Sequence, residues 1–388
     1  MLAFEESEKS PAIIKVVGVG GAGMNAVERM VAYNLQGVEL IVMNTDEQVL
    51  RRSSAPVKVH LGGKITRGMG AGARPEIGAQ AAMEDREKIN SVLKGADMVF
   101  ITAGMGGGTG TGASPIVAEV AQELGALTVG VCSLPFTAEG KRKMDIARQG
   151  QGKLREKVDT LITIPNDSIF KVIEKSTPIN MAFKALDDVL ARSVMGISDI
   201  INSTGYVNVD FADVKTVMSN NGDAVIGLGE GAGDNRVAEA MQTAICHPLL
   251  EGRSIEGATA VLINVVGGND LSLYEFNEIQ EKIHEMVSQD AQIIVGFTED
   301  VSLDEALSIT VIATGFKAKS KTAEDPAAGK KNELPGRAAS ALSPFNRRNI
   351  DQEESAQVDS SGGMKFPQIS ADSDNFEVPA YLRKKHSG

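Results

Sequence analysis

The segment Ala103-Gly104-Met105-Gly106-Gly107-Gly108-Thr109-Gly110-Thr111-Gly112 decides how this chain is interpreted. Six of the nine residues from Gly104 to Gly112 are glycine, and ordering glycine is entropically costly unless bare backbone must approach something closely. The segment follows a strand-like run and precedes a helical pattern, so it presents consecutive amides at a helix start, where phosphate binds well. It lacks the lysine of the Walker motif. The segment therefore predicts a phosphate cradle made of amides, threonine hydroxyls and a helix end.

A second glycine cluster, Gly18-Val19-Gly20-Gly21-Ala22-Gly23, has the pattern G-x-G-x-x-G directly after another strand-like run. This pattern is typical of a Rossmann NAD site, for which Asp46 stands near the position of the ribose-binding acid. It also fits a tight strand-to-helix turn with no ligand. The presence of two such clusters favours a phosphate-binding function over the plain turn.

Both clusters belong to an alternating pattern of strands and helices. Short apolar, β-branched runs are typical of strands that are covered on both faces. They occur at residues 12–19, 39–44, 97–103, 127–134 and 160–164. Between them lie helical patterns, including an apolar stripe from Ala26 to Val31 and a helix predicted to open at Pro115 and run to Leu124. Alternation predicts a parallel sheet with right-handed crossovers and a ligand beyond the carboxyl ends of its strands.

The remainder of the chain predicts a long helix, a second set of strands and a tail. The segment Ile179–Asn202 carries an apolar stripe from Met181 to Ile201 and is long enough to join two halves. Strand-like runs follow at 224–229, 258–266, 291–297 and 308–315, with helical stretches at 235–245 and 274–289. From Ala318 the composition is too polar to order itself, until an apolar segment returns near the end.

The predicted fold class is α/β: a parallel-sheet, Rossmann-like domain joined by a long central helix to a smaller α/β domain, with a disordered C-terminal tail. The predicted divisions are a flexible N-terminus (1–11), a nucleotide-binding domain (12–178), the central helix (179–203), a C-terminal activation domain (204–316), a disordered linker (317–374) and a partner-binding peptide (375–388).

Composition excludes several classes of protein. With 388 residues and 42% hydrophobic content, the chain can bury a large core. The formal net charge of −12, with 27 basic and 41 acidic residues before Lys317, argues against nonspecific nucleic-acid binding. Two cysteines and four scattered histidines predict no disulfide framework and no metal site, which favours a reducing cytoplasm. An acidic N-terminus and the lack of long apolar runs predict neither a signal peptide nor direct membrane insertion.

Several motifs, in this order, make the chain resemble the tubulin and FtsZ family of GTPases, and within it the bacterial FtsZ branch. The motifs are KVVGVGGAGMNAVERM, VMNTD, GAGARPEIG, GMGGGTGTGASP, LPFTAEGKRKM, TIPND, NVDFADVKTVMS and, near the C-terminus, FEVPAYLRKK. The likeness covers about Ile13 to Gly315. It implies GTP and GDP as ligands, with Mg²⁺ held mainly through the phosphates. It also implies head-to-tail assembly of identical chains.

The resemblance implies a set of nucleotide-binding residues. The phosphates are expected on the three glycine-containing loops, the ribose near Glu139, and the base near Asn166, Phe183 and Asp187, whose carboxylate would accept from the guanine ring N–H and amine. The expected set is Gly20, Gly21, Ala22, Gly23, Met24, Asn25, Asn44, Ala71, Gly72, Ala73, Gly104, Gly106, Gly107, Gly108, Thr109, Gly110, Glu139, Lys143, Asn166, Phe183 and Asp187.

The acids of Asn208-Val209-Asp210-Phe211-Ala212-Asp213 are the candidate catalytic residues. Asp210 and Asp213 are three residues apart at a predicted helix start, so their side chains share a face. Helix capping by Asp210 and a helix-dipole contact by Asp213 explain the same pattern. The resemblance implies instead that Asn208, Asp210 and Asp213 enter the nucleotide site of the next subunit and polarise the attacking water.

Three positions depart from the family pattern. Asp187 and Asp188 are adjacent where the family has one Asp, which leaves open which of them reads guanine. Lys143 stands where arginine is common, so either Lys143 or Arg142 takes the phosphate role. Arg74 replaces a usual asparagine, and fits a solvated surface charge as well as a phosphate contact.

The function predicted on these grounds is a GTP-dependent polymerising scaffold of bacterial cell division, cytoplasmic and acting at the division site. Residues 375–385 resemble a peptide that docks onto membrane-tethering and regulatory division proteins. Two alternatives remain at this point. They are an NAD-dependent Rossmann dehydrogenase and a nucleotide-gated filament scaffold that does not hydrolyse its nucleotide.

Overall fold

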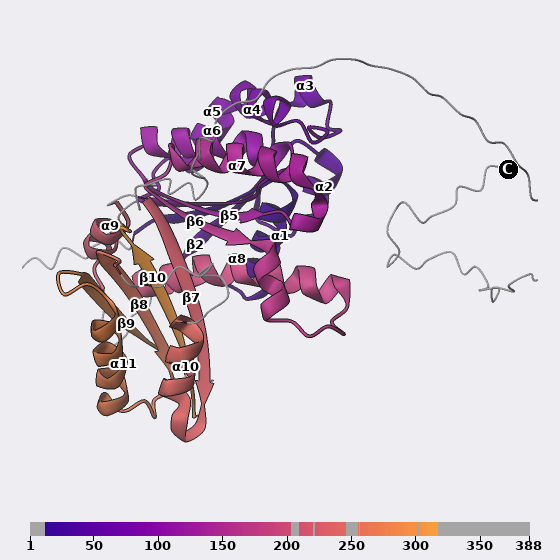
Figure 1. Cartoon of the computed structure of the whole chain (residues 1–388). Coiled ribbons are helices and arrows are strands. Elements are labelled where there is room, and N and C mark those ends of the chain that lie inside the picture. Colours follow the sequence, from indigo (N-terminus) through magenta and orange to yellow (C-terminus); the bar gives the residue numbers. More distant parts are fainter. Residues whose placement is uncertain are drawn as a thin grey trace, which may run out of the picture. The chain divides into compact units, whose positions relative to one another are not determined.

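The computed structural model describes residues 12–202, 209–219, 222–245, 255, 257–300, 303 and 305–316. The predicted N-terminal segment (1–11), linker (317–374) and peptide (375–388) lie outside the described residues, as does Asn208. Figure 1 shows the described part as two adjoining groups of strands with helices packed on them.

The first half is a parallel sheet of six strands. The strands are β1 (Ile14–Val19), β2 (Val38–Asn44), β3 (Val57–His60), β4 (Met98–Gly104), β5 (Leu127–Leu134) and β6 (Thr160–Pro165). Their spatial order is β3-β2-β1-β4-β5-β6, and every neighbouring pair is parallel. Five of these strands lie where apolar runs predicted them. Strand β3 was not predicted, because its four residues, VKVH, alternate in polarity and are only half covered.

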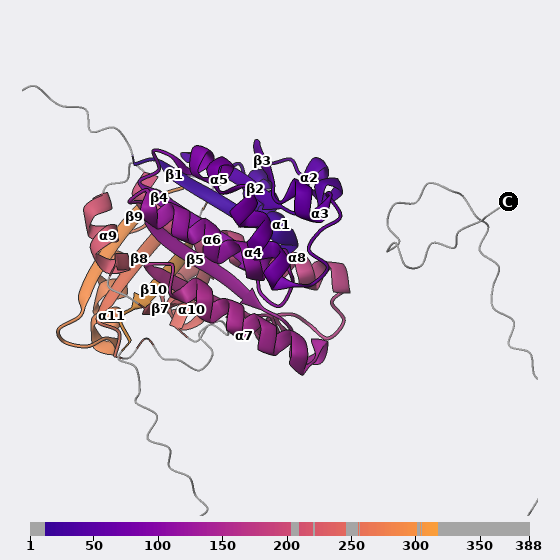
Figure 2. The same ribbon diagram turned by 90° about the horizontal axis from the view of Figure 1, so that it is seen from above.

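Helices cover both faces of this sheet. The helices of the first half are α1 (Gly20–Ala32), α2 (Glu47–Arg52), α3 (Gly63–Thr66), α4 (Pro75–Glu84), α5 (Arg86–Leu93), α6 (Thr109–Glu123) and α7 (Lys141–Arg155), with the 3-10 turns η1 (Thr137–Glu139) and η2 (Asn166–Lys171). One hydrophobic cluster joins α4 to α7 with one face of the sheet, and a second joins α1 and the central helix with the other. Figures 1 and 2 show these two helical layers.

The prediction that a helix opens at Pro115 was wrong. Helix α6 begins at Thr109, so the second half of the glycine segment is helical and Pro115 lies inside the helix. Tertiary packing outweighs the poor helix propensity of glycine here. A Cβ atom at Gly110 would lie 2.6 Å from the carbonyl oxygen of Gly104, and one at Gly112 would lie 2.0 Å from that of Pro75. Only glycine lets the backbone of β4 and of α4 approach α6 this closely.

The second half continues the same sheet. Its strands are β7 (Gly222–Ala232), β8 (Ala260–Gly267), β9 (Gln292–Glu299) and β10 (Ala306–Thr314), and its helices are α9 (Phe211–Ser219), the turn η3 (Gly233–Asn235), α10 (Arg236–Ile245) and α11 (Leu273–Met286). The order is β7-β10-β8-β9, in which β10 runs antiparallel to both of its neighbours. The first residues of β7 also pair with β6 in parallel. The two regions are therefore joined through β7 as well as through the central helix.

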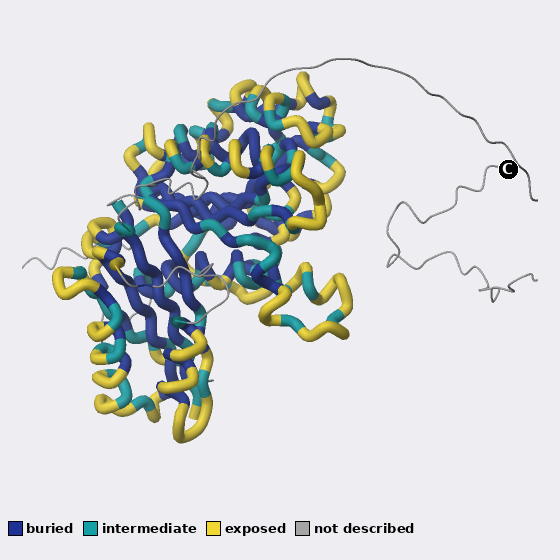
Figure 3. Tube along the Cα trace, viewed as in Figure 1, coloured by how far each residue is buried: buried dark blue, intermediate teal, exposed yellow. Residues whose placement is uncertain are grey.

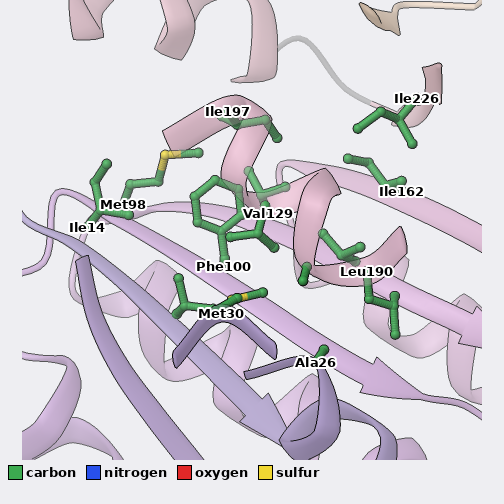
Figure 4. Close-up of a cluster of buried hydrophobic side chains, with 14 of the residues drawn as sticks. Ile14, Ala26, Met30, Met98, Phe100, Val129, Ile162, Leu190, Ile197 and Ile226 are labelled. Carbon is green, nitrogen blue, oxygen red and sulfur yellow. The ribbon is translucent and has the colours of Figure 1, made fainter. Parts of the chain in front are cut away.

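The central helix, α8 (Ile179–Asn202), crosses the sheet from end to end. Its 24 residues span about 36 Å at 1.5 Å per residue. Leu190 and Ile197 pack with Phe100, Val129 and other strand residues in the cluster drawn in Figure 4. Met181, expected on the apolar stripe, is instead half exposed, because the first turns of α8 extend beyond the sheet (Figure 3). No helix in the described ranges is both long enough and apolar enough to span a bilayer.

Gly229→Ala tests the close contact between β7 and α10. A Cβ atom at Gly229 would lie 1.9 Å from the carbonyl oxygen of Ala240, a distance that no side chain tolerates. We expect the free energy of unfolding to fall by about 1–3 kcal/mol, as for other overpacked sites. Urea unfolding of the full chain measures it. Gly267→Ala is the matched control on β8, because the nearest atom there is 3.6 Å away. Equal stability of the two variants would contradict this account of the packing.

Candidate functional site

The two glycine clusters lie side by side at one edge of the sheet. They follow β1 and β4, which are adjacent parallel strands although about 80 residues separate them in the chain. The strand order reverses direction between β1 and β4, and such a switch point is where ligands bind in open α/β sheets. A Cβ atom at Gly20 would lie 2.8 Å from the backbone nitrogen of Gly110. Helices α1 and α6 therefore begin against each other, and both amino termini face the same space.

A third loop closes the side of this space. It contains Gly70, Gly72 and Ala73, all with positive φ angles (84°, 58° and 56°). A Cβ atom at Gly108 would lie 2.8 Å from Cβ of Ala71 and 3.0 Å from the backbone nitrogen of Arg74. The loop is thus held directly against the glycine segment of β4–α6. The structure brings together all three loops that the sequence predicted for the phosphates.

Three glycines face open space inside this arrangement. Cβ atoms built at Gly21, Gly72 and Gly107 would meet no atom within 4 Å. Nothing in the protein fold therefore requires glycine at Gly21 or Gly107 for lack of room. A ligand that contacts the backbone does require it, and two helix amino termini favour an anionic one. The residues present fit a bound nucleoside triphosphate. We call the three loops, with the starts of α1 and α6, the cradle.

Polar side chains at the end of β2 hold the cradle in place through hydrogen bonds. The hydroxyls of Thr45 and Thr109 are 2.6 Å apart and tie β2 to the start of α6. Asn44 is buried, and its amide is used within the protein: Nδ2 donates to Sδ of Met24 (3.1 Å) and Oδ1 accepts from the amide of Asp46 (3.1 Å). Through these contacts, Asn44 and Met24 position α1 against β2 beside the cradle.

Asp46 does not have the role that a dinucleotide site requires. Its Oδ1 accepts from the amides of Gln48 (2.9 Å) and Val49 (3.2 Å), which makes Asp46 the N-cap of α2. The capping of α2 explains this acid without a ribose ligand. The NAD-dependent dehydrogenase alternative is therefore not supported.

Lys143 and Arg142 face different neighbours. A Cβ atom at Gly106 would lie 2.9 Å from Cγ of Lys143, so the stem of Lys143 crosses the phosphate segment. The Lys143 ammonium pairs with Glu139, whose other oxygen accepts from the amide of Phe136 at 2.8 Å. Arg142 instead lines a hollow of about 330 Å³ between α4, α6 and α7, together with Ala73, Arg74 and Lys153. Of the two adjacent cations, Lys143 is the one placed at the cradle.

The far end of the cradle is aromatic. Phe136, Phe170 and Phe183 form a cluster, with ring centroids 5.5 Å apart for Phe136 and Phe170 and 6.0 Å apart for Phe136 and Phe183. Phe183 remains half exposed at the start of α8. Asn166 begins η2 directly after β6, at the same edge of the sheet. An exposed aromatic face beside an amide side chain is suited to a flat nucleobase.

The two adjacent acids of α8 have separate partners. Asp188 accepts from Nε of Arg29 (2.6 Å), Nη2 of Arg29 (3.0 Å) and the hydroxyl of Tyr33 (2.8 Å). Asp187 is held by a hydrogen bond from the side chain of Asn25, in the first turns of α1. Burial and the charge of Asp188 raise the pKa of Asp187 to about 6, against the opposing effect of Arg29. Asp187 therefore lies against the first turns of α1, where the cradle begins, whereas Asp188 contacts the last turn of that helix.

The predicted catalytic acids lie at the opposite end of the molecule. Asp210 precedes α9, and its Oδ1 is 3.4 Å from the amide of Ala212; Asp213 is exposed in the first turn of α9. Helix α9 lies at the amino ends of the strands, since Thr160, the first residue of β6, hydrogen-bonds the carbonyl of Met218. The cradle lies at the carboxyl ends. Figures 1 and 2 both show α9 and α1 at opposite ends of the strands.

Four residues that the sequence did not predict also belong to the site, namely Arg29, Tyr33, Phe136 and Thr45. Arg29 and Tyr33 are four residues apart on α1, a spacing that puts them on one helix face. That spacing alone does not reveal Asp188, which is 159 residues away from Arg29. Thr45 is the first residue after β2 and Phe136 the second after β5, and their place at the carboxyl ends of predicted strands was the available signal for both.

Comparison with known proteins identifies the family. A model described as Tubulin/FtsZ family, GTPase domain, matches residues 13–174, and one described as FtsZ family, C-terminal domain, matches residues 222–317. The cell division protein FtsZ of Pseudomonas aeruginosa is 47% identical over 397 residues, which cover 99% of this chain and 100% of that protein. Among solved structures, an empty FtsZ dimer from M. jannaschii is 44% identical, with a TM-score of 0.76 over 79% of this chain and 89% of that one. CetZ2 from Haloferax volcanii, solved as a GTPgS-bound protofilament, shares the fold at 18% identity and a TM-score of 0.66, over 79% of this chain and 94% of that one.

The family models, the full-length relative and the solved structures agree with one another and with the cradle. The chain belongs to the tubulin/FtsZ family, in its FtsZ branch, and is a GTPase.

Proposed function

We propose that this GTPase is a polymerising scaffold of cell division, and that each GTP is hydrolysed where two subunits meet head to tail. The observation that carries the proposal is the separation between the cradle and the acids. The cradle lies beside Asp187 of α8, and the acids follow the carboxyl end of that helix, Asn202, which is 15 residues or about 22 Å further along the helix axis. One chain does not bring Asp210 or Asp213 to its own nucleotide. A second chain stacked head to tail on the first would bring its own Asp210 and Asp213 to the nucleotide of the first.

The residues of the cradle have separate roles in this proposal. The amides at Gly20–Gly23 and Gly104–Gly110, with Ala71–Ala73, hold the phosphates, and Lys143 adds positive charge. Glu139 accepts from the ribose, and Asn166 and Phe183 contact the base. Asp187 accepts from the guanine ring N–H and exocyclic amine, since Asp188 is already committed to Arg29. Mg²⁺ would be held mainly through the phosphates beside Thr109 and would neutralise charge developing on them.

The acids supplied by the neighbouring subunit complete the reaction. Asp210 and Asp213 stand on one face at the start of α9, where their carboxylates accept hydrogen bonds from a water and orient it towards the terminal phosphate. The water oxygen bonds to the phosphorus, the bond from that phosphorus to the oxygen bridging to GDP breaks, and the water loses a proton to one of the two carboxylates. Such transfers need positioning and charge stabilisation more than covalent chemistry. Asn208, outside the described residues, is proposed to act with them.

The surface around the cradle supports self-association. Several large apolar side chains are exposed there, among them Met69 and Ile179, each 76% exposed, and Phe170 at 65%. Large apolar side chains exposed to this degree gain stability when a second subunit covers them. A head-to-tail contact joins two different surfaces of the same chain and generates a filament when its rotation does not close. The relatives solved as an FtsZ dimer and as a CetZ2 protofilament also support self-association.

Residues 375–385 are proposed to bind membrane-tethering and regulatory division proteins. The segment FEVPAYLRKK offers Val378, Tyr381 and Leu382 as an apolar face, followed by three basic residues. The polar residues 317–374 would act as a flexible tether. This arrangement is consistent with a cytoplasmic filament held at the division site through its partners, without membrane insertion or nucleic-acid binding of its own.

GTPase activity per molecule is expected to rise with protein concentration. Because the active site forms between two subunits, dilution below the assembly threshold removes it. Phosphate release measured together with light scattering tests this, since both signals should appear at the same concentration. A rate per molecule that does not depend on concentration would contradict the shared site. Assembly with GTP but without phosphate release would contradict hydrolysis at the contact between subunits.

A further inference from the structure

Arg29 holds Asp188 in a contact that joins the phosphate-binding helix to the base-binding helix. The guanidinium makes two hydrogen bonds to the carboxylate, of 2.6 and 3.0 Å, and the hydroxyl of Tyr33 makes a third, of 2.8 Å. The Arg29 guanidinium also lies 5.5 Å from the centre of the Tyr33 ring. Paired donors on one carboxylate and a stacked aromatic ring fix Asp188 in one orientation.

Asp187, the next residue, has only partial compensation for its charge. Burial is the largest influence on its pKa, the negative charge of Asp188 is the second, and together they raise the pKa to about 6. Arg29 and the hydrogen bond from Asn25 act in the opposite direction. The charge state of Asp187 near neutral pH therefore depends on the balance between Asp188 and Arg29.

The other charged groups around the start of α8 are engaged elsewhere or exposed. From η2, Asp167 accepts from the amide and hydroxyl of Thr137, and Lys171 is exposed. From β7, Glu230 pairs with Arg192, which is one turn beyond Asp188 on α8. On α8 itself, Lys184 is exposed. In the described part of the chain, the charges that act on Asp187 are those of Asp188 and Arg29.

We propose that Arg29 is a positioning residue for guanine recognition, which neutralises Asp188 and thereby keeps Asp187 in its charged form. This inference rests on the proposed contact between Asp187 and guanine. A charged carboxylate accepts two hydrogen bonds and suits the guanine edge, which offers a ring N–H and an amine. A protonated carboxyl donates one and accepts one, and so suits the adenine edge, which offers a ring nitrogen and an amine. The charge on Asp187 therefore decides which base fits.

The two members of the ion pair should have opposite effects. In Arg29→Gln, the charge of Asp188 is no longer countered by Arg29 and only the hydrogen bond from Asn25 opposes it, so the pKa of Asp187 rises above about 6. The affinity for GDP then falls near neutral pH and recovers at higher pH. In Asp188→Asn the repelling charge is gone, so the pKa of Asp187 falls and GDP binding persists to lower pH. A purely structural clamp predicts the same loss from both variants, because both break the same contact between α1 and α8.

The experiment is equilibrium binding of GDP and ADP to the full chain from about pH 5.5 to about pH 8.5, a range that brackets the pKa of Asp187. We expect the midpoint of GDP affinity to move up in Arg29→Gln and down in Asp188→Asn, each on the order of one pH unit. The preference for GDP over ADP at pH 6.5 should fall about tenfold in Arg29→Gln. Arg86→Gln is the matched control, since Arg86 also joins two helices, through Glu119 and Glu123, away from the cradle.

Two outcomes overturn the inference, and a further variant separates it from the proposed function. Midpoints that move in the same direction in both variants, or not at all, overturn the role of Arg29. Asp187→Asn should weaken GDP binding and remove its dependence on pH in this range. If Asp187→Asn changes neither, the guanine contact itself is wrong. If Asp187→Asn behaves as expected while the Arg29 and Asp188 variants leave the midpoint unchanged, only the present inference fails.

Discussion

Asp213→Ala is expected to bind GTP as tightly as the unaltered chain and to hydrolyse it at least about a hundredfold more slowly. Its carboxylate is exposed at the start of α9, far from the cradle of its own chain, so removing it does not alter the bound nucleotide. It does remove one of the two groups proposed to orient the attacking water in the next subunit. Nucleotide binding to dilute protein and steady-state phosphate release from assembled protein measure the two effects separately.

The control for Asp213→Ala is another exposed acid in the first turn of a helix. Glu239 occupies that position in α10, so Glu239→Ala loses a comparable interaction with the helix dipole. It should leave both binding and hydrolysis unchanged. A parallel loss of binding and hydrolysis in Asp213→Ala would show that the acid belongs to its own chain's site and that the shared-site mechanism is wrong.

Mixing two inactive variants gives a sharper form of the same test. Asp213→Ala retains its cradle, and a variant that cannot bind nucleotide retains its acids. In a head-to-tail filament, the cradle of the first meets the acids of the second, and that contact is complete. The mixture should therefore recover GTPase activity that neither variant has alone. A mixture as inactive as its parts, while still co-assembling, would contradict catalysis across the interface.

The strands and the glycine loops could be predicted because local sequence determines them. Apolar, β-branched runs mark strands that are covered on both faces, and five of the first six strands were found on that basis. A glycine-rich segment directly after such a strand points to a ligand, since bare backbone is useful only where something approaches it. These signals lie within a few residues of one another. Local sequence is therefore sufficient to place the glycine loops at the carboxyl ends of their strands.

The missed features depend on residues that are distant in the sequence. Helix α6 extends back to Thr109 because α4 and β4 press against Gly112 and Gly110, and helix propensity contains no information about those neighbours. The first residues of β7 pair with β6, although the sequence suggests two separate regions. Arg29 meets Asp188 only through the packing of α1 on α8. Local sequence also left open whether Asp187 or Asp188 contacts the base. The side-chain contacts favour Asp187, because Asp188 is already bound by Arg29 and Tyr33.

Gly107→Val is expected to abolish nucleotide binding without weakening the fold. A Cβ atom at Gly107 meets nothing within 4 Å, so the protein has room for the larger side chain. That room is the space proposed for the phosphates, where the added methyl groups would separate the ligand from the amides of Gly106–Gly108. Losing several charge-assisted hydrogen bonds should lower the GTP affinity by at least about a hundredfold. Isothermal titration with GTP and thermal unfolding without nucleotide measure the two effects.

The matched control separates the loss of ligand space from the cost of inserting valine. Gly152 in α7 also has nothing within 4 Å of a built Cβ atom, but it lies away from the cradle. Gly152→Val should therefore keep both its unfolding temperature and its GTP affinity. If Gly107→Val still binds GTP, the open side of the glycine segment is not where the phosphates lie. If instead it unfolds at a much lower temperature than Gly152→Val, glycine is needed there by the protein itself. Bare backbone at Gly107 would then no longer indicate a nucleotide, because the fold alone would explain the glycine.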